Sequence, residues 1–60
     1  MTFKELERLL ISNGWYHHHT RGSHYIYKNK EFFVNVVVPN HKGDIPKGTL
    51  NSILKQAGLK

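Results

Sequence analysis

The chain has 60 residues, enough for one small domain and too few for a second hydrophobic core. It contains no cysteine, which excludes the small secreted folds that depend on disulfide bonds. Nine lysine and arginine residues against four acidic residues give a formal net charge of +5, which favours an anionic partner such as nucleic acid or an acidic protein.

No apolar segment reaches the length of a membrane span, and the N-terminus lacks the hydrophobic region of a signal peptide. We therefore expect a cytoplasmic domain that does not bind a membrane. The basic residues are scattered singly along the sequence. Only the folded chain can therefore assemble them into a positive surface.

The first predicted element is a helix over residues 2–13. Thr2 and Glu5 have the spacing of a capping box, in which each side chain accepts a hydrogen bond from the backbone N–H of the other residue. Apolar residues then recur at helical spacing and define one buried face, made of Phe3, Leu6, Leu9 and Leu10. Gly14 supplies the left-handed residue that ends the helix.

Strands are predicted over residues 15–20, 24–28 and 31–38, and they form a three-stranded antiparallel meander. Gly22 allows the first tight turn, and Asn29-Lys30 forms the second. Alternation along the third strand directs four side chains to the core: Phe32, Val34, Val36 and Val38. It places Phe33, Asn35 and Val37 on the other face, where an apolar patch suits a partner, and Pro39 ends the strand.

A second helix begins between Asp44 and Lys47, with Asp44 as the expected N-cap and Pro46 in the first turn. Its buried face contains Leu50, Ile53, Leu54 and Ala57, and Gly58 ends it. This order predicts an α+β fold of the form α-β-β-β-α, in which a three-stranded antiparallel sheet carries both helices on one face. The other face of the sheet stays open for function.

A histidine follows the first predicted turn, in Arg21-Gly22-Ser23-His24. Histidine takes up and releases protons near neutral pH. In RNA cleavage without a metal ion, a base removes the proton of a 2′-hydroxyl group, which attacks the adjacent phosphorus, and an acid protonates the leaving 5′-oxygen. His24 is therefore a candidate catalytic residue, and Arg21 is a candidate phosphate ligand. Further candidate cations are Lys28, Lys30, Lys42 and Lys47. The alternative interpretation is that His24 is only a polar residue beside a hairpin turn.

The run His17-His18-His19 raises the question of a metal site. Consecutive strand residues alternate between faces, which places His17 and His19 on one face and His18 on the other. His17, His19 and His41 are a conceivable ligand set, but neither a cysteine nor an H-x-x-x-H helix supports zinc binding. We expect no metal and no cofactor, since the sequence also lacks a glycine-rich phosphate-binding loop.

Several segments resemble the HicA family of toxin ribonucleases, and together they cover nearly the whole chain. They are Gly14-Trp15, Arg21-Gly22-Ser23-His24, Val36-Val37-Val38-Pro39, Ile45-Pro46-Lys47-Gly48-Thr49-Leu50 and Ile53-Leu54-Lys55-Gln56-Ala57-Gly58-Leu59. The resemblance implies a single HicA-like domain over residues 1–60, with a fold like that of a double-stranded-RNA-binding domain. It implies an endoribonuclease (mRNA interferase) that cleaves single-stranded mRNA, acts as the toxin of a type II toxin–antitoxin system and is neutralised by a HicB-type antitoxin.

In this resemblance the family's catalytic histidine falls on His24. The RNA-binding residues expected around it are Arg21, Gly22, Ser23, Lys28, Lys30, Lys42 and Lys47. Two alternatives stay open: a non-catalytic double-stranded-RNA-binding module, and a protein-interaction domain that uses Phe33 and Val37. A homodimer and a toxin–antitoxin hetero-oligomer are both compatible with the sequence.

Overall fold

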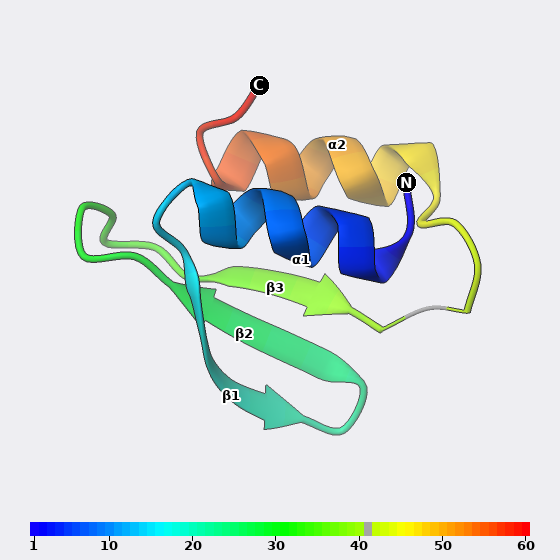
Figure 1. Ribbon diagram of the computed structural model, residues 1–60, viewed down its shortest axis with the longest axis horizontal. Helices are drawn as coiled ribbons and strands as arrows, with labels where there is room; N and C mark the ends of the chain where they lie inside the picture. Colours follow the sequence, from blue (N-terminus) through cyan, green and yellow to red (C-terminus); the bar gives the residue numbers. More distant parts are fainter. Residues whose placement is uncertain (41) are drawn as a thin grey trace.

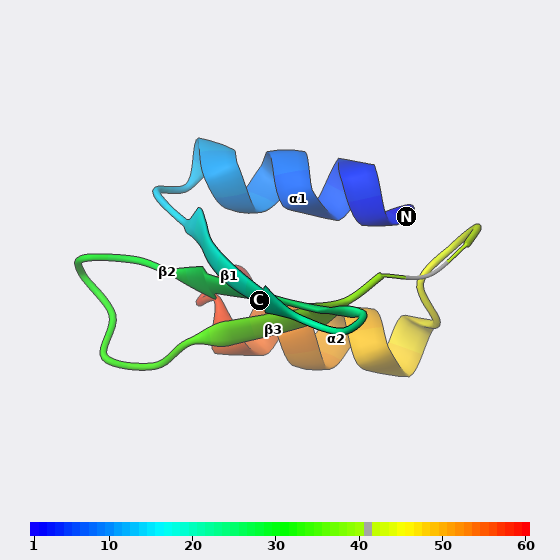
Figure 2. The ribbon, with the colours of Figure 1, turned by 90° about the horizontal axis from the view of Figure 1, so that it is seen from below.

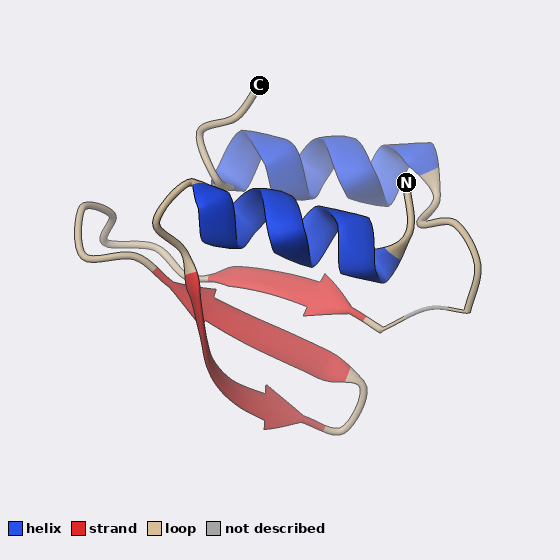
Figure 3. Cartoon of the chain, in the orientation of Figure 1, coloured by secondary structure: helices blue, strands red, loops and turns tan. Residues whose placement is uncertain are grey.

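The computed structural model describes residues 1–40 and 42–60 of the chain. Its elements are α1 (Phe3–Ser12), β1 (Tyr16–Arg21), β2 (His24–Lys28), β3 (Val36–Pro39) and α2 (Lys47–Gln56). The strands form one antiparallel sheet in the order β1-β2-β3, below two helices that run in the same direction (Figures 1 and 3). The predicted α-β-β-β-α order is confirmed.

The first helix begins as its capping box predicts. The backbone N–H of Thr2 donates to Glu5 Oε1 at 2.8 Å, and the backbone N–H of Glu5 donates to Thr2 Oγ1 at 3.2 Å. Leu6 and Leu10, one helical turn apart, are completely buried. Gly14 has a φ of 92°, so the chain leaves the helix through the left-handed conformation that glycine tolerates.

Both helices pack on the same face of the sheet. Tyr27 pairs with Val36 across β2 and β3, and directly paired residues of an antiparallel sheet share a face. These two side chains belong to one buried cluster that also contains Leu6 of α1 and Ile53 of α2. Figure 2 shows the helices apart from each other, with α2 beside β3. Among the elements of residues 1–40 and 42–60, no helix covers the opposite face of the sheet, as predicted.

The third strand is shorter than predicted, and the reason lies at Asn29. This residue is 8% exposed, its side chain donates to the Asn13 carbonyl at 3.2 Å, and its Oδ1 accepts from the Glu31 backbone N–H at 3.0 Å. These bonds hold residues 29–32 in a turn and away from the strand ladder. The expected strand start at Glu31 and the expected core position of Val34 are therefore wrong, because Val34 is exposed in the loop.

The start of α2 also differs from the prediction. Pro46 occupies the N-cap position and makes no side-chain hydrogen bond, so Asp44 is not the cap. Asp44 instead forms a β-bridge with Thr2 and lies 3.7 Å from the N-terminal amino group. The predicted end of the helix is confirmed, since Gly58 has a φ of 71° and the Leu59 N–H donates to the Leu54 carbonyl at 2.8 Å.

One end of the molecule gathers several functional candidates. Both helices begin at the end that holds the β1–β2 hairpin, while the loop between β2 and β3 extends from the other end (Figure 1). The Asn40 backbone N–H donates to the Ser23 carbonyl at 2.8 Å, which fixes the chain after β3 to the hairpin turn. Helix N-termini carry partial positive charge, so this end attracts anions.

Candidate functional site

His24 is the first residue of β2 and is exposed at the hairpin turn. Gly22 forms the turn with a φ of 56°, and no atom of the described residues lies within 4 Å of the position that a Cβ would take there. Arg21, the last residue of β1, pairs directly with His24. Paired Cα atoms in an antiparallel ladder are about 4.5–5.5 Å apart, so the guanidinium and the imidazole start from adjacent positions on one face.

That face is the open one. Tyr25 and Tyr27 alternate with His24 and Ile26 along β2, and the two tyrosines face α1: the Tyr25 ring lies 4.9 Å from the Phe3 ring. His24 and Ile26 therefore point away from the helices. Lys28 belongs to the same face but lies four residues from His24, at the other end of the strand. The structure thus brings together two of the predicted site residues, Arg21 and His24.

The other predicted site residues lie at different places relative to His24. Gly22 and Ser23 form the turn itself. Lys42 follows Asn40, which is bonded to Ser23, and Lys47 is the first residue of α2 at the same end of the molecule (Figure 1). Lys30 lies in the loop at the opposite end and is not brought near His24.

The histidine run does not alternate as predicted, because β1 contains a bulge. His17 pairs with Tyr27 and His19 pairs with Ile26, so the register shifts between them. Tyr27 and Ile26 face opposite sides of the sheet, and His17 and His19 do so too. The His17 ring accordingly packs against the tyrosine rings on the helix side, with its centroid 5.2 Å from that of Tyr25.

The bulge separates the ligands of the conceivable metal site. His17 and His19 cannot converge on one ion from opposite faces, and His41 lies outside the described residues. Over residues 1–40 and 42–60, no three metal-ligating side chains cluster. The same part of the chain contains no helix with the length and hydropathy needed to cross a membrane.

His19 is a member of the open face that sequence reasoning missed. It pairs directly with Ile26, two residues before Arg21 on β1, and lies on the face that also carries His24. Desolvation by neighbouring groups and then the charges of His18 and Arg21 lower the pKa of His19. The neutral imidazole is favoured as a result, which is the form that accepts a proton. Three identical residues in a row carry no alternation, so no pattern in the sequence indicates the bulge that directs His19 here.

The centre of the open face is apolar. Ile26 and Val37 pair directly across β2 and β3, and Val37 is 41% exposed. The predicted partner of Val37 in this patch, Phe33, is fully exposed but lies in the loop after β2 and not in a strand. The expected Phe33–Val37 patch is therefore wrong: Val37 is exposed on this face, and its neighbour there is Ile26, which is only 7% exposed.

The fold and this face define a small α+β domain with a basic, histidine-bearing sheet surface. The chain matches, over residues 3–59, the family described as the HicA toxin of bacterial toxin-antitoxin. It therefore belongs to the HicA toxin family, and its predicted resemblance to that family is confirmed. A search of curated proteins gives no match.

Proposed function

We propose that this chain is an endoribonuclease that cleaves single-stranded mRNA without a metal ion, with His24 as a general acid or base. The observation that carries the proposal is the direct pairing of Arg21 with His24 on an exposed sheet face, in a member of a toxin family. Arg21 binds the non-bridging oxygens of the scissile phosphate, and the imidazole beside it moves a proton. Lys28 extends the positive surface along β2.

The reaction needs both a base for the 2′-hydroxyl group and an acid for the leaving 5′-oxygen. His19 is a candidate for the base because it shares the face of His24 and its pKa is lowered, which favours the neutral imidazole. His24 then acts as the acid. In this assignment His19→Ala removes the decline in the cleavage rate at acidic pH, whereas an unchanged pH–rate profile contradicts a role for His19.

Cleavage assays with two substrates separate this function from its main alternative. The protein is incubated with single-stranded and with double-stranded RNA, each with and without a chelator. Cleavage of the single strand that persists in the chelator supports the proposal. Tight duplex binding without cleavage supports a double-stranded-RNA-binding module. Loss of cleavage in the chelator supports a metal-dependent mechanism.

The same face suits the antitoxin that a member of this family implies, and we assign it to a HicB-type protein. A net charge of +5 favours an acidic partner, and the exposed Val37 beside Ile26 offers apolar contact at the centre of the face. A bound antitoxin would then exclude RNA from His24. Val37→Asp is expected to weaken the complex, with Phe33→Asp in the distant loop as the matched control. Equal weakening by both variants would contradict this placement.

A further inference from the structure

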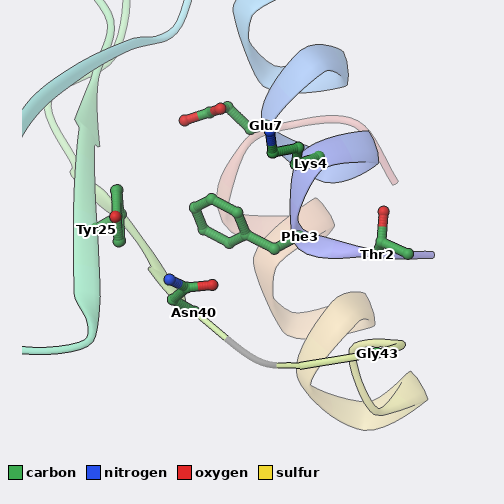
Figure 4. Close-up of a pocket in the computed structure, with 7 residues that line it drawn as sticks. All are labelled: Thr2, Phe3, Lys4, Glu7, Tyr25, Asn40 and Gly43. Carbon is green, nitrogen blue, oxygen red and sulfur yellow. The ribbon is translucent and has the colours of Figure 1, made fainter.

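A cavity of about 440 Å³ lies on the helix side of the sheet, beside the start of β2 (Figure 4). Phe3, Lys4 and Glu7 of α1 form one wall, Tyr25 of β2 forms the other, and Asn40 lies at one end. Cavities of this size hold small organic ligands, and no residue of the cavity has a role in the proton transfers described above. The cavity therefore calls for an occupant of its own.

Its aromatic wall suits a planar ring. The Phe3 and Tyr25 rings are 4.9 Å apart with an interplanar angle of 62°, and Figure 4 shows Phe3 between the helix and Tyr25. Both rings are only partly buried, so part of their surface is free for contact. Proteins that bind unpaired RNA commonly hold nucleobases against such aromatic side chains.

The carboxylate of Glu7 is held in position at the cavity. Its Oε2 accepts a hydrogen bond from the hydroxyl of Tyr27, a side chain that is completely buried and therefore fixed. Within residues 1–40 and 42–60, its Oε1 has no hydrogen-bond partner, and Figure 4 shows Glu7 reaching from α1 toward β2. Lys4 precedes Glu7 by three residues, so the two side chains leave α1 on the same face.

Together, Lys4 and Glu7 present a donor beside two acceptor oxygens. Guanine offers the complementary edge: its O6 accepts from an ammonium group, and its N1–H and N2–H₂ donate to a carboxylate. Adenine and cytosine instead place a ring-nitrogen acceptor opposite the carboxylate, and uracil offers one N–H between two carbonyl groups. We propose that this cavity binds a guanine base of the RNA substrate and sets the cleavage preference of the enzyme.

The cavity and the proposed catalytic residue lie at the same end of β2, on opposite faces of the sheet. Tyr25 follows His24 in the chain, and Asn40 is bonded through its backbone N–H to the Ser23 carbonyl. An RNA strand with a base beside Tyr25 reaches Arg21 and His24 by passing round the hairpin turn at Ser23. This assignment rests on the proposed ribonuclease activity, to which it adds the base specificity.

The first test measures cleavage of four short single-stranded RNAs that differ in one base. The wild-type protein is expected to cleave the guanine substrate about tenfold to a hundredfold faster in kcat/KM, the discrimination of a bidentate base contact. Glu7→Gln replaces one acceptor oxygen with a donor and keeps an acceptor for Tyr27, so the preference is expected to collapse. The control Glu31→Gln, an exposed residue in the distant loop, retains it.

Wild-type cleavage without a guanine preference, or full preference in Glu7→Gln, overturns the guanine site and leaves the ribonuclease proposal standing. A second measurement keeps the two proposals separable if no RNA is cleaved. Binding of 3′-GMP, 3′-AMP, 3′-CMP and 3′-UMP to His24→Ala is followed by chemical shifts of the Phe3 and Tyr25 amides. Tighter binding of GMP that is lost in the double variant with Glu7→Gln supports the site, and equal binding of all four nucleotides overturns it.

Discussion

Replacing Tyr27 by phenylalanine tests the contact that links the core to the cavity. Tyr27 is completely buried and donates its hydroxyl hydrogen to the Glu7 carboxylate. A hydrogen bond to a charged group contributes about 1.5–3 kcal/mol. Glu7 is partly exposed, so water replaces part of the lost bond, and we expect a loss of about 1–2 kcal/mol. For a domain of this size that corresponds to a fall in Tm of roughly 5–15 °C.

The assay is thermal unfolding followed by circular dichroism, with Tyr16→Phe as the control. Tyr16 is 47% exposed, and its hydroxyl has no hydrogen bond to residues 1–40 or 42–60, so its loss is expected to change stability by less than about 0.5 kcal/mol. A Tm of Tyr27→Phe equal to that of Tyr16→Phe would refute the proposed bond to Glu7.

The pH dependence of the same variant gives a second check. Burial, and then the hydrogen bond to Glu7, raise the pKa of Tyr27 above its usual value. The unfolded chain then loses the phenolic proton first, near pH 10, so the contribution of Tyr27 is complete below that pH and is lost as the pH rises above it. The difference in Tm between wild type and Tyr27→Phe should be constant from pH 6 to about 9 and shrink above about pH 10. A constant difference up to pH 11.5 would contradict the raised pKa.

Three further predictions concern the frame around the site. Gly14→Ala should lower the free energy of unfolding in urea more than Gly22→Ala does. Both glycines have positive φ, but a Cβ at Gly14 would lie 3.1 Å from Asn29 Nδ2, whereas a Cβ at Gly22 would have no neighbour within 4 Å among the described residues. Hydrogen bonds from the helix cap lower the pKa of Glu5, so the stability that Glu5 contributes is present above about pH 4.5 and is lost as the pH falls. Glu5→Gln should therefore reduce the fall in Tm at acidic pH. An unchanged fall in Tm would contradict the cap. Phe33→Ser should change the free energy of unfolding by less than about 0.5 kcal/mol in the same urea assay, whereas a loss above 2 kcal/mol would indicate the strand position that the sequence suggested.

The parts of the fold that local sequence determines were predictable. The capping box at Thr2 and Glu5 and the left-handed glycine Gly58 each act through neighbouring residues, and the helix ends lie close to where they predict. The second strand has the predicted bounds, His24–Lys28, because a turn glycine precedes it and its aromatic residues favour a strand.

The parts that failed depend on contacts between distant segments. Asn29 ends the β2–β3 pairing early because its side chain is bonded to Asn13, 16 residues away. Phe32 leaves the strand pattern and packs against Trp15, with ring centroids 4.9 Å apart. Neither contact is visible in the alternation of residues 31–38, which resembles that of a longer strand.

The candidate site likewise has one part that local sequence predicts and another part that depends on contacts between distant segments. The position of His24 beside the hairpin turn was expected from the sequence, whereas Arg21 was expected in the turn and instead ends β1, paired with His24. The position of His19 depends on a bulge, and the cavity at Phe3 and Tyr25 depends on how α1 lies over β2. Positions of this kind require the folded structure, because no local pattern encodes them.

The most direct test of the central claim is the rate at which His24→Ala cleaves a single-stranded RNA in the presence of a chelator. General acid–base catalysis by one residue contributes about 10²–10⁴-fold. Glu31→Ala, which removes an exposed side chain in the loop between β2 and β3, is the control, and the Tm of both variants should stay near that of wild type. The account predicts a loss in kcat of that size for His24→Ala and none for Glu31→Ala. Wild-type cleavage by a folded His24→Ala variant would contradict it.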